Sequence, residues 1–339
     1  MKRRDFLVNS ATAAAGFAVV GNLNACKPAS APATSELFKI SLAEWSVNSL
    51  VFGNKIQELG WVKFADMLAN DYETLMAGNP MTNLDFPKFA RKNGIEAVEF
   101  VNTCFFNKAE NNAYLTELKG VVDGEGIKSL LIMCDAEGEI GNPDADLRMK
   151  SVENHYKWVD AAAFLGCHSI RVNAASSGTY EEQMQLAADG LFKLCEYADK
   201  AGINVLVENH GGLSSNGQWL SGVMKSVNHP RVGTLPDFGN FTVNHETGEQ
   251  YDRYLGVSEL MPYAKAVSAK STDFNEQGDE TNTDYFKTMK IVLDAGYRGY
   301  VGIEFEGTGM SQPDGIIATK KLLERVRDAL QRPVQIGAT

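Results

Sequence analysis

The stretch "KAGINVLVENHGG" at residues 200–212 contains the unit that decides the fold of this chain. A helix-like segment stops at Gly202, a mostly apolar run follows, and that run ends in Glu208 and His210. Glycine commonly follows the last helical turn because this position often needs a positive φ. A run rich in Val and Leu is typical of a strand that is covered on both faces. The stretch therefore predicts a helix, a buried strand, and polar side chains where the strand ends.

The same unit recurs along the chain and predicts a parallel sheet. Apolar runs follow a glycine or a polar cluster at residues 91–100, 124–135, 165–173, 200–210, 229–240, 263–271 and 295–307, and a first run without such a lead-in lies at 37–45. Strands that alternate with helices form parallel sheets covered by helices. Eight units in one chain favour a closed (β/α)8 TIM barrel over an open doubly wound sheet. No G-x-G-x-x-G motif follows the first run, which counts against a dinucleotide fold.

Helix signals lie between the predicted strands. Residues 146–166 place apolar side chains at helical spacing. Residues 179–202 begin with Thr179 and Glu182 in the spacing of a capping box and end at a glycine. The segment 46–90 is long for a single crossover, so we expect an extra loop or helix over the mouth of the barrel.

Residues 1–26 indicate an export signal. They begin with a twin-arginine start and continue through an Ala-rich run that is too short and too polar for a membrane span. "LNAC" at 23–26 resembles a lipobox with Cys26 as the acylated residue; the alternative is a plain signal peptide with a chance cysteine. Residues 27–36 are a Pro/Ala/Ser-rich linker, which leaves 37–331 for the barrel. We expect an exported, periplasmic lipoprotein whose only membrane contact is a lipid anchor at Cys26.

Composition excludes two other classes of function. The formal net charge of −11 argues against nucleic-acid binding, because phosphate binding needs clustered Lys and Arg. The cysteines after Cys26 match no zinc signature in their spacing. In a chain of 339 residues we expect them to be buried thiols, although an oxidising compartment permits disulfides.

Three of the predicted strands end in a carboxylate: Glu208 on the fifth, Asp237 on the sixth and Glu304 on the eighth. A barrel brings the carboxyl ends of its strands together, and that end carries the chemistry. Buried carboxylates so close together raise one another's pKa, and a divalent cation relieves this repulsion. Oxygen ligands suit Mg²⁺ or Mn²⁺ better than zinc. The alternative for each residue alone is a rim carboxylate paired with Lys or Arg.

The segments "VENHGG", "PDFGN" and "GIEFEG", together with this order of acidic strand ends, resemble the xylose isomerase-like TIM barrels, the sugar (phosphate) isomerase and epimerase group. The resemblance covers residues 37–331. It implies that Glu208, Asp237 and Glu304 are metal ligands. It also implies that Glu208 and Glu304 are the catalytic acid and base, on opposite faces of a sugar.

Two positions depart from the family pattern. The family usually carries a metal-binding His in a His-x-Lys pattern on the seventh strand, where this chain has Ser268 and Lys270. It often carries a substrate-contacting His three residues after the sixth-strand Asp, where this chain has Asn240. Water, Ser268 or His210 are the candidates for the fourth ligand, since His210 follows Glu208 by two residues and shares its side of an extended strand.

Polar and aromatic residues near the strand ends are the candidates for substrate binding. They are Lys270, Asn240, His210, Glu99, Asn173, Trp45 and His245. A salt bridge is the alternative for Lys270. Trp45 and Trp219 could each stack on a sugar face, and rim packing is the alternative for both.

These observations predict a metal-dependent sugar isomerase or epimerase that removes a proton α to a carbonyl and acts on a small-molecule sugar. One alternative is a lyase or hydratase on a keto-sugar glycoside, which would expel a β-substituent after the same step. A second alternative is a non-catalytic carbohydrate-binding lipoprotein. The sequence leaves the sugar and the oligomeric state open.

Overall fold

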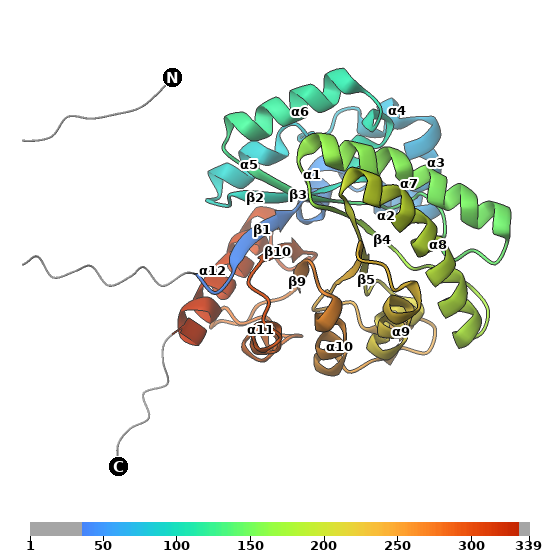
Figure 1. Cartoon of the computed structure of the whole chain (residues 1–339). Coiled ribbons are helices and arrows are strands. Elements are labelled where there is room, and N and C mark those ends of the chain that lie inside the picture. The colour runs from blue at the N-terminus through green and yellow to red at the C-terminus, as the bar shows by residue number, and fades with distance from the viewer. Residues whose placement is uncertain (1–35, 332–339) are drawn as a thin grey trace, which may run out of the picture. The chain divides into compact units, whose positions relative to one another are not determined.

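The computed structural model describes residues 36–331 (Figure 1). The predicted signal peptide at 1–26 and almost all of the linker at 27–36 lie outside these residues. Eight parallel strands form the central sheet, and each overlaps one of the apolar runs. Their bounds are β1 (Lys39–Ala43), β2 (Ala97–Val101), β3 (Lys128–Met133), β4 (Ser169–Val172), β5 (Asn204–Glu208), β6 (Val232–Leu235), β9 (Val267–Ser271) and β10 (Tyr300–Phe305).

The sheet closes into a barrel. Its strand order is β6-β5-β4-β3-β2-β1-β10-β9, so β6 and β9 are its two edges. Backbone hydrogen bonds join these edges: Lys265 N–H donates to Thr234 O at 3.0 Å, and Ser268 N–H donates to Pro236 O at 2.9 Å. The (β/α)8 TIM barrel predicted from the repeating unit is therefore confirmed.

Helices surround the strands, as Figure 1 shows. The helices after β2 are α6 (Asn112–Gly124), α7 (Ala145–Leu165), α8 (Tyr180–Ala201), α9 (Gly217–Val227), α10 (Arg253–Leu260), α11 (Tyr285–Asp294) and α12 (Gln312–Gln331). Short 3-10 turns are η1 (Glu44–Val47), η2 (Asn102–Lys108), η3 (Gly212–Ser215) and η4 (Met261–Tyr263), and a small hairpin consists of β7 (Thr242–Asn244) and β8 (Glu249–Gln250). The predicted capping box begins α8, and Gly202 ends it with φ 72°.

The long segment between β1 and β2 is helical. It contains α1 (Asn48–Phe52), α2 (Lys55–Leu59), α3 (Trp61–Asn70), α4 (Tyr72–Met76) and α5 (Phe86–Lys92). The first residue of α3, Trp61, reaches the cavity at the end of the barrel. The expected extra helices at the barrel mouth are therefore present. Within residues 36–331, no helix combines the length and the apolar character that a membrane crossing needs.

Alternation along β10 puts apolar side chains on the outer face of the barrel and a carboxylate on the inner face. On β10, Val301, Ile303 and Phe305 belong to the hydrophobic core. The intervening Gly302 and Glu304 point to the other face, because successive strand residues point to opposite faces. The four cysteines of the described residues are buried free thiols, as expected.

Candidate functional site

Three carboxylates meet at the C-terminal end of the barrel, where the strand ends predict them. Glu208 ends β5, Asp237 follows β6, and Glu304 lies on β10. Each offers one oxygen, and the three oxygens lie within 4.8 Å of one another. All three side chains are buried. Carboxylates packed this closely away from water need compensating positive charge.

Backbone hydrogen bonds hold Asp237 in one orientation. Its Oδ1 accepts from Gly239 N–H at 2.8 Å and from Asn240 N–H at 2.7 Å. The side chain of Asn209 accepts from the Asp237 N–H at 2.7 Å and donates to the Asp237 carbonyl at 3.0 Å. Because these contacts occupy Oδ1, the other oxygen is left to face the remaining carboxylates.

Ser268 lies between two of the acids, at the position where the family pattern has His. Its Oγ is 2.7 Å from Asp237 Oδ2 and 2.9 Å from Glu304 Oε2. A hydroxyl carries one proton, so it donates to only one of these oxygens at a time. Ser268 therefore bridges the pair without neutralising it.

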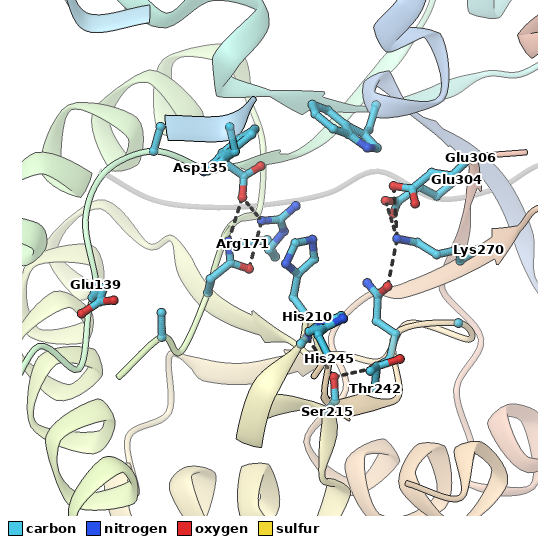
Figure 2. A pocket seen from close by; sticks show the side chains of 18 of the residues that line it. Asp135, Glu139, Arg171, His210, Ser215, Thr242, His245, Lys270, Glu304 and Glu306 are labelled. Atoms are coloured by element: carbon cyan, nitrogen blue, oxygen red, sulfur yellow. Dashed lines mark hydrogen bonds and ion pairs between the residues drawn. The ribbon is translucent and has the colours of Figure 1, made fainter. Parts of the chain in front are cut away.

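Lys270 is the buried cation on the β9 and β10 side of the site (Figure 2). Its Nζ is 3.4 Å from Glu304 Oε1 and 3.2 Å from Glu306 Oε1, and it donates to Asn240 Oδ1 at 3.2 Å. Burial alone would raise the pKa of Glu304, but the positive charges of Lys270 and Arg171 outweigh it and lower that pKa. Glu304 is therefore a carboxylate at neutral pH.

Arg171 on β4 is a second buried cation, which the sequence analysis missed. Its Nη1 lies 2.8 Å from Asp135 Oδ1, and Asn173 Nδ2 donates to the same oxygen at 2.7 Å (Figure 2). Its Nε lies 2.8 Å from Glu208 Oε2, without the alignment of a hydrogen bond. A signal was available in "SIRVN", because Arg171 is two residues from Asn173 and shares its face of the strand.

The site contains more carboxylates than positively charged side chains, so a divalent cation would balance its charge. Burial raises the pKa of both Glu208 and Asp237, so these groups resist ionisation in the absence of added positive charge. The two buried cations face five carboxylates, namely Asp135, Glu208, Asp237, Glu304 and Glu306. Glu208 Oε2 is buried without a hydrogen-bond partner. This donor set fits a hard, oxygen-preferring cation such as Mg²⁺ or Mn²⁺.

A cavity of about 730 Å³ lies at this end of the barrel. It is lined by seven of the predicted residues, Trp45, Asn173, His210, Asn240, His245, Lys270 and Glu304. It is also lined by residues that the sequence analysis did not select, among them Trp61, Asp135, Glu139 and Arg171. Enclosure in the wall and the charge of Arg171 lower the pKa of His210, which favours a neutral imidazole.

The two proposed acid and base residues differ in how they meet this cavity. Glu304 lines it, whereas Glu208 is fully covered. Arg171 covers one oxygen of Glu208, and Asn240 Nδ2 donates to the other at 3.2 Å. Of these two residues, Glu304 is therefore the one that faces the cavity.

Glu99 lies away from the cavity that its prediction as a substrate contact requires. The strand β2 continues to Val101, so Glu99 is in mid-strand and points into the barrel interior. Its Oε1 accepts from Ser41 Oγ at 2.6 Å, and its Oε2 has no partner. It borders a separate cavity of about 100 Å³ that is lined by residues at the start of strands, such as Lys128 and Tyr300. A substrate contact does not fit this position.

The same burial predicts a pH-dependent stability. Burial raises the pKa of Glu99 to about 8, whereas an unfolded Glu titrates near about 4.3. The folded protein therefore binds a proton that the unfolded chain releases, and its stabilising effect is lost as the pH rises towards and through 8. In Glu99→Gln, we expect the fall in unfolding free energy between pH 5 and pH 9 to be smaller by a few kcal/mol.

Urea unfolding of the metal-free proteins, followed by circular dichroism, measures this slope. Glu117→Gln, at an exposed position of α6, is the matched control and should retain the wild-type slope. Parallel pH profiles for Glu99→Gln and wild type would show that Glu99 is ionised in the folded protein.

Trp219 packs in the core and does not line the cavity, so it is not placed to stack on a sugar there. Trp219 is fully buried, and its Nε1–H donates to Tyr180 O at 3.0 Å. His155 is likewise a buried residue of α7, where its Nδ1 contacts Ser151 O at 2.7 Å. Neither side chain lines the cavity.

Comparison with known proteins agrees with the geometry. The family model described as xylose isomerase-like TIM barrel matches residues 87–328. None of the curated proteins matches the chain in sequence.

Several solved structures share the fold at low sequence identity. A 3-keto-D-glucoside 4-epimerase from E. coli is 14% identical, with a TM-score of 0.59 over 74% of this chain and 96% of that chain. A xylose isomerase-like TIM barrel protein from Mycobacterium smegmatis in complex with magnesium is 18% identical, with a TM-score of 0.59 over 86% and 98%. A probable 3-DHS dehydratase from Bacillus anthracis is 18% identical, with a TM-score of 0.56 over 85% and 99%. At these identities the likeness concerns the fold alone.

Proposed function

The chain belongs to the xylose isomerase-like TIM barrel family, and we propose that it is a metal-dependent sugar isomerase or epimerase. The reaction begins with removal of a carbon-bound proton next to a carbonyl. The observation that carries the proposal is the set of three buried carboxylates within 4.8 Å of one another beside a cavity. Epimerases of known structure with this fold are consistent with it.

Glu208, Asp237 and Glu304 would hold the cation, and Ser268, which contacts two of them, is the candidate for a fourth ligand. His210 lies outside the group whose ligand atoms approach one another within 4.8 Å. When bound, a divalent cation of the Mg²⁺ or Mn²⁺ type polarises the carbonyl and stabilises the negative charge that develops on its oxygen. The chain's own task is to orient these oxygens. The backbone contacts to Asp237 and the Ser268 bridge do so before any ligand enters.

Glu304 is the proposed base. It lines the cavity, and its lowered pKa keeps it ionised. It accepts the proton from the carbon next to the carbonyl. The electron pair of the broken C–H bond forms a carbon–carbon double bond, and the π pair of the carbonyl moves to its oxygen. Lys270, at 3.4 Å from Glu304, can then hold a substrate oxygen.

Return of the proton completes an isomerisation or an epimerisation. Glu208 is the proposed second acid and base, which would return the proton to carbon. Because Arg171 and Asn240 cover Glu208, these side chains must move aside for Glu208 to reach the opposite face of a sugar. Protonation of the neighbouring carbon would move the carbonyl, and protonation of the same carbon from the other face would invert it.

The excess of carboxylates in the cavity wall favours a neutral sugar over a sugar phosphate. Asp135, Glu139 and Glu306 line the cavity with Glu304, and the buried cations are already paired with acids. Ionised carboxylates repel a phosphate and accept hydrogen bonds from hydroxyl groups.

A lyase or hydratase is the second candidate function, and the cover over Glu208 favours it. Elimination needs one base to take the α-proton, after which the electron pair forms the double bond and the β-substituent leaves. Glu304 alone meets this need, because it is the member of the pair that lines the cavity. A dehydratase is also among the proteins that share the fold.

The proposal is tested by incubating the purified protein with a panel of keto-sugars and keto-glycosides, with Mn²⁺ and after EDTA treatment. We expect NMR to detect an epimer, an isomer or an unsaturated product only in the metal-loaded sample. A product of oxidation or of simple hydrolysis would contradict the proposal. Sugar binding without any turnover would favour the non-catalytic carbohydrate-binding alternative.

A further inference from the structure

We propose that the outer part of the cavity is a second subsite, which binds the aglycone or second ring of a glycoside through the indole of Trp61. This inference rests on the proposed function, since it places the reacting sugar beside Glu304. It names the substrate class as an extended neutral glycoside and not a free monosaccharide. Two observations on the cavity support it: its volume and the two tryptophans that line it. Two more concern the wall around Ala136 and Glu139, here called the far wall: its fixed backbone and its polar groups.

The cavity is too large for one sugar ring. Its volume of about 730 Å³ is in the range of clefts that enclose a whole drug-sized ligand, about 300–1,000 Å³. At roughly 30 Å³ per water molecule, the cavity volume corresponds to about two dozen waters, which is more than one sugar ring displaces. Figure 2 shows Glu139 on the opposite side of the cavity from Lys270 and Glu304. A ring held at Glu304 therefore leaves the side near Glu139 vacant.

Trp61 offers an exposed aromatic face at this cavity. It lines the cavity, yet 44% of its surface is exposed. The ring is anchored, because it packs on Phe64 with 5.6 Å between centroids, and the fully buried Phe64 meets Phe52 edge to face at 5.0 Å. Val62 beside it is also an exposed apolar residue. A large apolar surface that is held rigid and left uncovered at a cavity mouth is typical of a binding surface.

Indole rings bind sugars and aryl groups by stacking. The C–H face of a pyranose and the face of an aryl aglycone are both apolar, and an amphipathic aromatic side chain covers either at low entropic cost. Trp45, in the turn η1 after β1, lines the same cavity and is partly buried. Two tryptophans from different segments therefore border one space.

The far wall of the cavity is built in advance. Ala136 has φ 61°, a left-handed conformation that residues other than glycine rarely adopt. Asn102 holds the residue before it, because its side chain donates to Asp135 O and accepts from Asp135 N–H, both at 2.9 Å. Trp158 Nε1–H holds the residue after it by donating to the buried Glu137. Backbone strain maintained by such contacts is common at ligand sites.

This wall presents groups that suit hydroxyl-bearing ligands. Glu139 is exposed, and both Glu139 and Asn173 line the cavity. Carboxylate and amide oxygens accept hydrogen bonds from hydroxyl groups. The combination of an indole face with acceptor oxygens fits a second sugar ring or a hydroxylated aryl aglycone.

Equilibrium binding tests the subsite without requiring turnover. Isothermal titration of the Mn²⁺-loaded protein should show that phenyl β-D-glucopyranoside binds more tightly than methyl β-D-glucopyranoside. In Trp61→Ala, we expect this preference to fall by about 3- to 10-fold, the size of one aromatic contact. Trp61→Phe should retain most of it, because an aromatic face remains.

Val62→Ala is the matched control, because Val62 is exposed beside Trp61 and does not line the cavity. It should keep the wild-type preference. An unchanged preference in Trp61→Ala, or no preference in wild type, would overturn the subsite. Failure of the proposed function would appear differently, as keto-glycosides that bind with the predicted preference and are not converted.

Discussion

Replacing Glu304 by Gln is expected to lower kcat for a converted keto-sugar by about 10³-fold or more, which is within the range of about 10²–10⁴ for a general acid–base group together with loss of a metal ligand. The substitution removes the ionised oxygen that lines the cavity. It also leaves Lys270 with Glu306 as its remaining acidic partner. The amide is close to the carboxylate in size, so the core should stay intact.

Turnover is measured by NMR with saturating Mn²⁺, and thermal unfolding verifies the fold. Glu306→Gln is the control, because Glu306 shares Lys270 and lies at the edge of the cavity. Its loss should be at most about tenfold, on the scale of a single charge contact. Equal losses in the two variants would show that the charge near Lys270 matters and that Glu304 is not the base.

Replacing Asp237 by Asn is expected to weaken divalent-cation binding by about 100-fold or more, because even residues behind the ligands contribute about 10- to 100-fold. Asp237 Oδ1 accepts two backbone N–H groups, so an asparagine oxygen would take that place. The amide nitrogen would then point at the other carboxylates and at the cation position. A donor at that position cannot act as a ligand.

Mn²⁺ titration and elemental analysis after dialysis measure this loss. Asp135→Asn is the matched control, because Asp135 is paired with Arg171 in the cavity wall and is outside the three-carboxylate set. It should retain most of the bound metal. Equal metal content in Asp237→Asn and wild type would remove Asp237 from the ligand set.

The barrel and the three carboxylates could be predicted because each depends on a local pattern. An apolar run followed by a carboxylate marks a strand end at Glu208, at Asp237 and at Glu304. A closed parallel barrel then brings these ends together, whatever the details of packing. The capping box at Thr179 and the helix end at Gly202 also depend on a few neighbouring residues.

The residues that sequence reasoning missed depend on tertiary packing. Arg171 shares its strand face with the selected Asn173, but its role follows from the acids that the barrel places around it. Trp61 comes from a helix far from any strand end and reaches the cavity through the folding of the segment between β1 and β2. Glu99 shows the opposite failure. The strand β2 continues two residues beyond Glu99, so this side chain lies in the barrel interior and not at the strand end.

Lys270 and Arg171 do not fully compensate the buried carboxylates of the site. Lys270 and Arg171 are each shared between acids, and burial still raises the pKa of Glu208 and of Asp237. The chain therefore holds its carboxylates in place at an electrostatic cost that a divalent cation would relieve. In a cluster with a structural role alone, we would expect a cation for each buried carboxylate.

Deuterium incorporation tests the central claim, removal of a carbon-bound proton, most directly. The metal-loaded protein is incubated in D₂O with a keto-glycoside that it converts, and the sugar is followed by proton NMR. We predict that the signal of the proton α to the carbonyl disappears through exchange, or that the β-substituent leaves, and that neither occurs in Glu304→Gln. Conversion of the sugar with full retention of the α-proton would contradict the account and indicate hydride transfer or hydrolysis.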